Sequence, residues 1–401
     1  MIKLKVEMNQ EETKLWNRHF ILLLIAHSCA QMGYQILVPS LPVYFQTIGK
    51  GEQVIGMLAG LMAVTAILSR PYVGKALDSQ NKRNVYITGL FFHLIASGLY
   101  VWGESTFILS LLRLLHGFGI GITTAAAATI AADFIPKKRL AEGVGFFSMA
   151  TVVSMAVTPA VGLYLANQNH YTALFSLAVL FIGAAILFCL CLNQKERDTN
   201  LNKKNQQTEV GKKEGRTAVI MACIAFCVTL PYSAIVTFLA LYAKQAEISN
   251  IEWFFIVYAG IILLARPAAG RLADQKGEAF VVIPSMLMTC LSLLLLSIAE
   301  TFLSFMTVAL FLAMGYGTIQ PALQSIVLRR TPASRRGRAM STFFLGMDIS
   351  YGIGPLLCGV LVRLYSYSTM FLSSIIFILM GCILYFFYFH LKGRDKNELS
   401  V

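Results

Sequence analysis

Charged residues are scarce in this chain: they make up 13% of its 401 residues, whereas a soluble protein carries about 25%. Several enzyme motifs are missing as well. The sequence has no His-Glu-x-x-His pair, no Gly-x-Ser-x-Gly turn and no glycine-rich nucleotide loop. No polar segment is long enough to form a large soluble domain. These absences argue against a soluble protein and against an enzyme, and we expect no cofactor.

Cysteine pairs in exposed loops are also lacking. All eight cysteines lie inside apolar segments, which favours packing over disulfide formation. Cys189 and Cys191 have the spacing of a metal-binding pair, but two small side chains in an apolar segment are better explained by packing. The sequence therefore predicts neither a disulfide nor a metal site.

Long apolar segments are abundant. A helix needs about 20 apolar residues to cross a bilayer, and twelve segments reach that length. The first six lie near 18–45, 54–76, 85–103, 106–132, 143–166 and 171–192, and the second six near 217–243, 253–273, 279–299, 302–328, 339–364 and 369–391. The sequence therefore predicts an all-α membrane protein with twelve transmembrane helices.

The basic residues gather on one side of these segments. If the N-terminus is cytoplasmic, the cytoplasmic side receives nearly all Lys and Arg, which give the chain its net charge of +13, and the opposite side carries mainly Glu. This is the positive-inside distribution of a protein of the inner (plasma) membrane, and it argues against the alternative that the charge binds nucleic acid. Both termini and the polar segment 193–216 are therefore expected in the cytoplasm.

The two halves of the chain repeat each other with an offset of 196 residues. Such a repeat predicts two six-helix bundles, 1–192 and 217–401, joined by a cytoplasmic linker at 193–216. The matched residues are Arg70 and Arg266, Gly74 and Gly270, Asp78 and Asp274, Pro136 and Pro332, and Pro159 and Pro355.

The segment after the second predicted span carries a family resemblance. Gly74, Asp78, Lys82 and Arg83 resemble the loop signature of the major facilitator superfamily, which has a Gly, three positions, an Asp, a second Gly and two basic residues. Asn81 stands in place of the second Gly, and Asn tolerates a left-handed backbone better than most residues. The resemblance covers essentially the whole chain. It implies two pseudo-symmetric bundles that rock around a central site near the bilayer midplane.

The resemblance also implies a cytoplasmic gate that holds the outward-facing state. In this interpretation the loop carboxylates accept N–H bonds from the start of a neighbouring helix, and the two basic residues pair with a carboxylate at the end of the fourth span. The alternative is that the basic residues only fix the orientation in the membrane. The residues of the predicted gate are Gly74, Asp78, Lys82, Arg83, Asp133, Gly270 and Asp274.

Arg113 and His116 interrupt the apolar fourth span, just before three glycines at 117, 119 and 121. A buried Arg in a membrane helix is costly and is functional by default, while the glycines allow close helix packing. The arrangement resembles the fourth-helix motif of proton-coupled family members. The alternative is that Arg113 extends to the outer headgroups.

The fifth span resembles a degenerate form of the family's antiporter motif. Ser154, Thr158, Pro159 and Gly162 stand in the first half, and Gly354 and Pro355 stand at the repeated position in the second. Small residues and Pro bend and pack helices. The motif favours export over symport, although Gly-Pro pairs in membrane helices also serve packing alone.

Asp348 is an acidic residue deep inside a predicted span, the eleventh. An ionised carboxylate at that depth needs a raised pKa, a cationic partner or a water-filled cavity. We therefore expect Asp348 to carry the coupling proton, with Arg113, His116 and His27 as further proton-coupling residues. The alternative is a structural carboxyl bonded to Ser350 or Tyr351.

Polar stripes mark three further spans, the first, seventh and tenth, which line the central cavity in the family that the chain resembles. A single stripe would be typical of interhelical hydrogen bonding, but three are better explained by a substrate path. The predicted cavity residues are His27, Gln31, Tyr34, Gln35, Tyr232, Thr237, Tyr316, Gln320 and Gln324.

Together these features predict a secondary transporter, acting as a monomer in contact with membrane lipid. We expect it to export a small organic molecule in exchange for protons by alternating access. A proton-coupled uptake symporter is the alternative, and a membrane sensor without transport is a remoter one.

Overall fold

The chain folds into long helices in a computed structural model that describes residues 15–50, 52–192, 210–248 and 250–397. The described residues form no strand. The helices of the first half are α2 (Arg18–Gln35), α3 (Leu37–Thr47), α4 (Glu52–Ser79), α5 (Lys82–Leu99), η1 (Tyr100–Trp102), α6 (Thr106–Phe134), η2 (Lys137–Arg139), α7 (Leu140–Asn167) and α8 (Tyr171–Leu190). Those of the second half are α9 (Val210–Gln245), α10 (Glu252–Lys276), α11 (Ala279–Ser297), α12 (Phe302–Met314), α13 (Tyr316–Arg330), α14 (Arg336–Leu364) and α15 (Tyr367–Asn397).

Eleven helical segments among the described residues are long and apolar enough to cross a membrane. The helix α4, with 28 residues, covers the remaining predicted span. The prediction of an all-α membrane protein with twelve membrane-crossing segments is therefore confirmed. The helix α9 begins at Val210, inside the segment 193–216 that the sequence suggested as a linker, and residues 193–209 of that segment lie outside the described part.

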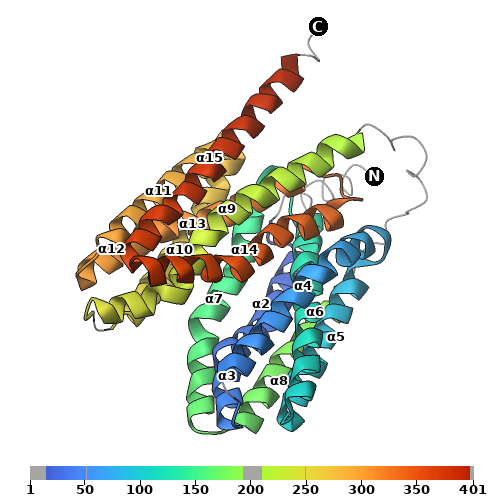
Figure 1. Ribbon diagram of the computed structural model, residues 1–401. Helices are drawn as coiled ribbons and strands as arrows, with labels where there is room; N and C mark the ends of the chain where they lie inside the picture. The colour runs from blue at the N-terminus through green and yellow to red at the C-terminus, as the bar shows by residue number, and fades with distance from the viewer. Residues whose placement is uncertain (1–14, 51, 193–209, 249, 398–401) are drawn as a thin grey trace. The chain divides into compact units, whose positions relative to one another are not determined.

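The chain divides into two compact units (Figure 1). The first unit contains α2 to α8 together with residues Thr331–Ser341, and the second contains residues Gln206–Arg330 and Thr342–Val401. Because α14 begins at Arg336, its first turns belong to the first unit and the rest of the helix to the second.

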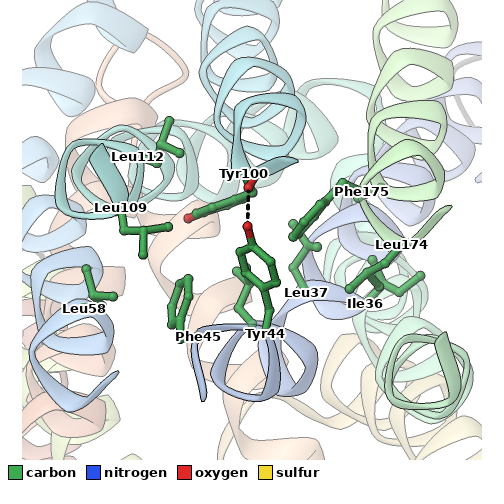
Figure 2. Packing of buried hydrophobic residues seen from close by; sticks show 12 residues of the cluster. Ile36, Leu37, Tyr44, Phe45, Leu58, Tyr100, Leu109, Leu112, Leu174 and Phe175 are labelled. Atoms are coloured by element: carbon green, nitrogen blue, oxygen red, sulfur yellow. Dashed lines mark hydrogen bonds between the residues drawn. The ribbon is translucent and has the colours of Figure 1, made fainter. Parts of the chain in front are cut away.

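Apolar side chains from five helices fill the core of the first unit (Figure 2). Tyr44 lies at its centre, with its ring edge-on to Phe175 at 5.2 Å and its hydroxyl donating to the Tyr100 carbonyl at 3.1 Å. The second unit has a similar tie, in which the Tyr242 hydroxyl donates to the Ala299 carbonyl at 3.0 Å. In each unit a tyrosine of the first long segment thus satisfies a carbonyl near the end of another helix.

Two of the predicted spans are broken helices. The first changes from α2 to α3 at Ile36, three residues before Pro39, whose nitrogen has no N–H to donate to the preceding turn. The tenth changes from α12 to α13 at Gly315. A Cβ atom at Gly315 would lie 2.4 Å from Thr289 Oγ1 on α11, so the break occurs at a close approach of two helices.

Candidate gate and transport site

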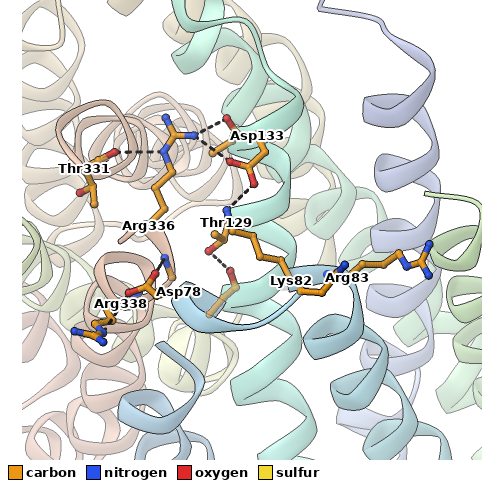
Figure 3. A network of polar contacts seen from close by, with 12 residues as sticks. Asp78, Lys82, Arg83, Thr129, Asp133, Thr331, Arg336 and Arg338 are labelled. Atoms are coloured by element: carbon orange, nitrogen blue, oxygen red, sulfur yellow. Dashed lines mark hydrogen bonds and ion pairs between the residues drawn. The ribbon is translucent and has the colours of Figure 1, made fainter. Parts of the chain in front are cut away.

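Asp78 lies in the last turn of α4 and contacts the first turn of α14 (Figure 3). Its Oδ1 accepts the Gly337 N–H at 2.8 Å and the Arg338 N–H at 3.4 Å, and Arg338 Nε lies 3.2 Å from Oδ2. The first N–H groups of a helix have no partner within the helix and carry a partial positive charge. Asp78 therefore caps α14 from a helix that is more than 250 residues away in sequence.

Two glycines make this contact possible. A Cβ atom at Gly337 would lie 2.3 Å from Leu77 Cβ and 2.8 Å from Asp78 Oδ1. A Cβ atom at Gly74 would lie 2.9 Å from the Arg338 Cα atom. Real Cβ atoms do not approach other atoms so closely, so any larger residue at either position would separate the two helices.

Asp78 lies two residues beyond the predicted span 54–76 and is largely buried under α14. Burial raises the pKa of the Asp78 carboxyl to about 6, while the N–H groups of Arg338 and Gly337 and the charges of Arg338 and Lys82 act in the opposite direction. Asp78 therefore takes up a proton at a less acidic pH than an exposed aspartate does.

Asp133, at the end of α6, joins two cations (Figure 3). Lys82 Nζ lies 2.5 Å from Asp133 Oδ2, and Arg336 NH1 lies 3.4 Å from Oδ1 while donating to the Ala132 carbonyl at 2.8 Å. Arg83 is directed away from Asp133 and donates to the Leu192 carbonyl at 2.8 Å, beyond the end of α8. Lys82 thus has the partner that the sequence suggested, whereas Arg83 supports the end of another helix.

Asn81 does not use the left-handed backbone that its position suggested. Its φ angle is −65°, and its side chain caps α5 by accepting the Arg83 N–H at 3.0 Å. Asn81 occupies the position of the second Gly of the family signature, and with ordinary backbone geometry it caps the start of α5.

In the second half the corresponding charges are reversed. Glu278 and Arg329 lie 196 residues after Lys82 and Asp133, and Arg329 Nε lies 3.7 Å from Glu278 Oε1. Arg329 also forms a close ion pair with Asp274, the counterpart of Asp78. Glu278, which stands where the family signature has a basic residue, is thus paired with Arg329, and Arg329 stands at the position that matches Asp133. Gly270 is buried in α10, one turn before Asp274.

Two buried arginines tie helices together at repeated positions, a role that the sequence analysis did not assign. Arg70 donates to the Gly121 carbonyl and to Thr124 Oγ1, both at 2.9 Å. Arg266 donates to the Gly317 carbonyl at 2.7 Å, and Gly317 lies 196 residues after Gly121. The repeat of the Arg-Pro pair in both halves could have indicated that these arginines have a role, but no sequence pattern shows to which carbonyl each Arg donates.

Arg113 and His116 of α6 are both buried, with exposed fractions of 6% and 1%. The Arg113 guanidinium lies over the Phe45 ring, 5.3 Å from its centroid, so it does not extend to the surface as the alternative interpretation required. His116 Nδ1 lies 3.3 Å from the Tyr100 hydroxyl. The ring of His93, on α5, lies edge-on to His116 at 4.7 Å, and neither His93 nitrogen has a hydrogen-bond partner among the described residues. His93 was missed because a lone His in an apolar span gives no signal.

The polar stripe of the first span contacts other helices of its own unit. His27 stacks on Phe147 of α7 at 4.4 Å, and Gln31 donates to Thr151 of α7 at 3.1 Å. Tyr34 lies parallel to His93 at 6.0 Å and edge-on to His116 at 5.9 Å. The stripe thereby connects α2 with the polar groups of α5, α6 and α7, and Gln35 is buried next to it.

The polar residues of the seventh and tenth spans meet in the second unit. The rings of Tyr232 and Tyr316 stack at 3.8 Å. Gln324 is buried on α13 and Gln320 is half-buried on the same helix. The Thr237 hydroxyl donates within α9, to the Ser233 carbonyl at 2.8 Å.

The Pro-containing helices α7 and α14 pack closely against the first helix of their own units. The Ser154 hydroxyl lies 3.4 Å from the Ser28 carbonyl, and its counterpart Ser350 donates to the Phe226 carbonyl at 2.7 Å. A Cβ atom at Gly162 would lie 2.3 Å from the Ile36 carbonyl oxygen, and one at Gly354 would lie 2.1 Å from Ser233 Oγ. Thr158 donates within α7, and Pro159 and Pro355 lie inside the two helices.

Asp348 is half-buried on α14. The hydroxyls that the structural alternative assigned to it have other contacts: Ser350 donates to Phe226, and the Tyr351 hydroxyl lies 3.4 Å from that of Tyr316.

Membrane-crossing helices, with charged contacts at the ends of several of them, define a polytopic membrane protein. A family model described as Major Facilitator Superfamily matches residues 23–250 and 221–400. The chain therefore belongs to the Major Facilitator Superfamily, as its loop signature suggested, and it is a multi-pass membrane transporter, not an enzyme.

Named relatives agree with this assignment. The chain is 25% identical over 363 residues to an uncharacterized MFS-type transporter of Methanocaldococcus jannaschii, covering 88% of this chain and 94% of the relative. It is 21% identical to the multi-drug resistance efflux pump PmrA homolog of Lactococcus lactis, over 98% of this chain and all of the relative. The MFS transporter FucP, solved in the outward conformation, has a TM-score of 0.77 at 14% identity, over 93% of this chain and 99% of that one.

Proposed function

We propose that this transporter exports small organic molecules in exchange for protons, with the two bundles 1–192 and 217–401 alternating access to a central site. The observation that carries the proposal is the Asp78 contact with the first turn of α14. It is a small, polar, glycine-dependent contact between distant segments, so it can form and break without disturbing a helix core. Such an element suits a gate between two conformations of similar free energy.

Export is favoured over uptake by the relatives and by the fifth-span motif. A multidrug efflux pump is similar to the chain over almost its whole length. Pro159 and Pro355, with small residues around them, lie where α7 and α14 touch the first helix of their units. The alternative, a proton-coupled uptake symporter, would use the same fold and differs in the direction in which the proton gradient moves the substrate.

Everted membrane vesicles distinguish the two directions. With a respiration-generated, acidic vesicle interior, an exporter takes up a fluorescent aromatic substrate, tested with 2-naphthoate and with ethidium, and a protonophore releases it. Vesicles without the protein and vesicles with Asp348→Asn serve as controls. Gradient-driven loss of preloaded ethidium from the vesicles would contradict export and favour uptake, and no response with any tested solute would favour a sensor.

The proposal includes a cytoplasmic location for both termini and for the segment around Asn205, in the inner (plasma) membrane. A single Cys at position 205, in a variant without native cysteines, should react with an impermeant thiol reagent in everted vesicles but not in intact cells. Labelling from outside intact cells would contradict this topology and the direction of export derived from it.

A further inference from the structure

Four tyrosines gather near Arg266 in the second unit. Tyr232 and Tyr316 stack with an interplanar angle of 12°, and Tyr258 lies nearly parallel to Tyr232 with centroids 6.0 Å apart. The Tyr316 hydroxyl lies 3.4 Å from that of Tyr351. Three of the rings are buried, whereas Tyr351 is 44% exposed. The cluster, contributed by α9, α10, α13 and α14, thus extends from the protein interior to an exposed ring.

The repeat shows that packing alone does not require these rings. The first half fills three of the matched positions with aliphatic or thioether side chains on the corresponding helices. Both halves share the same helix tie, from Arg70 to Gly121 and from Arg266 to Gly317, so the local geometry is comparable. The matched pairs are Met62 and Tyr258, Ile120 and Tyr316, and Met155 and Tyr351.

The exposed member of the cluster has the same position on its helix in both halves. Met155 is 45% exposed and Tyr351 is 44% exposed. A tyrosine in place of a methionine at equal exposure adds a flat aromatic face and a hydroxyl, but no further burial. Aromatic faces bind other rings by offset stacking, and hydroxyls donate to acceptors. Burial therefore does not explain the difference between the halves.

Arg266 sets the charge that the cluster favours. Its guanidinium is buried and interacts electrostatically with all four tyrosines. An Arg always keeps its charge, so Arg266 adds a positive contribution to the field at the cluster, which favours an acceptor or a negative group over a cation. Planar rings and this field together select an aromatic molecule that is neutral or anionic.

We propose that Tyr232, Tyr258, Tyr316 and Tyr351 form a binding site for a planar aromatic ligand with an acceptor or a carboxylate, which Arg266 distinguishes from aromatic cations. This proposal rests on the proposed function in that the ligand is a transported molecule. Binding requires neither a proton gradient nor a direction of transport, so the two proposals can fail independently.

Two probes with the same ring and opposite charge test the site: 2-naphthoate and 2-naphthylmethylammonium. Their affinities are measured by calorimetry with the full chain in nanodiscs, with empty nanodiscs as the reference. We expect 2-naphthoate to bind at least about tenfold more tightly than the amine. The variants Tyr351→Met and Tyr316→Ile, which install the residues of the first half, should each weaken naphthoate binding at least about fivefold.

The control variant is Tyr385→Met, which removes a buried tyrosine of α15 outside the cluster and should leave naphthoate binding unchanged. If Tyr316→Ile does not fold, Tyr351→Phe replaces it: this variant keeps the exposed ring and should lose part of the preference for naphthoate. Equal or tighter binding of the amine, no naphthoate binding at about 5 mM, or full naphthoate affinity in Tyr351→Met would each overturn the proposal. Naphthoate binding without gradient-driven uptake of either naphthoate or ethidium by the vesicles would instead contradict the proposed export.

Discussion

At the scale of single residues, the two buried arginines show what a repeat preserves. Arg70 and Arg266 each donate to the carbonyl of a Gly on another helix of the same unit. A buried guanidinium is tolerated only when its donors are paired, and both contacts sit where glycine lets the helices approach. A Cβ atom at Gly121 would lie 2.0 Å from Ser69 Oγ. Both arginines therefore share a structural role, which is to hold two helices of their own unit together.

Replacing either arginine should destabilise its own unit. In Arg70→Met, the Gly121 carbonyl loses its charged donor while the side-chain volume is largely kept. We therefore expect the free energy of unfolding to fall by about 2–3 kcal/mol. The melting temperature of the purified protein should fall by several degrees, as measured by intrinsic fluorescence. Lys75→Met, at an exposed position of the same helix, is the control. Equal melting temperatures for both variants would contradict the assignment.

Asp78 should affect the rate of transport more than the affinity for substrate. Asp78→Asn keeps an oxygen for the Gly337 N–H but loses the ion pair with Arg338, so it changes the balance between conformations. We expect substrate affinity within about twofold of the original and a transport rate lower by about tenfold or more. Ethidium binding and vesicle uptake measure the two quantities. A normal rate would make Asp78 an ordinary loop residue.

Some of the residue contacts could be predicted from the sequence. A carboxylate one turn after a Gly, repeated in both halves, indicated that Asp78 would meet the start of a helix, and the geometry has such a contact. The sequence did not indicate His93, because a single His in an apolar span lacks a pattern, or the opposite polarity of the Glu278 and Arg329 pair. Charge pairs are set by spatial neighbours, which a loop signature does not contain.

At the scale of elements, α14 is the helix that links the two units. Its first turns lie in the first unit and its remainder in the second. The contact of its first turn depends on glycine, since a Cβ atom at Gly337 would lie 2.3 Å from Leu77. The contact at Asp78 therefore lies inside the first unit, although most of α14 belongs to the second.

Gly337→Ala tests how closely this turn must pack. The added methyl group cannot be accommodated without moving α4 or α14, because overpacking shifts the backbone. We expect amides at 331–341 to exchange with deuterium about tenfold faster, while exchange elsewhere in α14 changes little. The matched control is Gly352→Ala on the same helix, where a Cβ atom would meet nothing within 4 Å. Equal exchange in both variants would show that the close contact is dispensable.

The lengths of the elements were easier to predict than their breaks. The lengths of the apolar segments were enough to predict twelve membrane-crossing segments, because a helix needs about 20 apolar residues to cross a bilayer. The breaks at Ile36 and Gly315 were not predicted. The close approach that accompanies the break at Gly315 involves Thr289 on a different helix. Local sequence could not show that approach.

At the scale of the whole molecule, the two halves share a plan but differ in chemistry. In the first unit, the ring centroids of His93 and His116 lie 4.7 Å apart, and the Arg113 guanidinium lies 5.3 Å from the centroid of the Phe45 ring. The second groups tyrosines around Arg266 and carries Asp348. The residue that matches Asp348 in the first half is Val152. Packing at this position therefore does not require a carboxylate, which is why we expect Asp348 to couple transport to protons.

Asp348→Asn should uncouple substrate movement from the proton gradient. Asn has the shape of the protonated carboxyl and cannot release a proton, so the variant should bind substrate and exchange it between equilibrated compartments. It should lose at least about tenfold of its gradient-driven accumulation, and substrate addition should no longer release protons. Proteoliposomes with a pH-sensitive dye measure both. Glu300→Gln, at an exposed loop position, is the control and should behave like the original. Full proton-coupled transport by Asp348→Asn would transfer the role to His27 and His116 or to a different coupling ion.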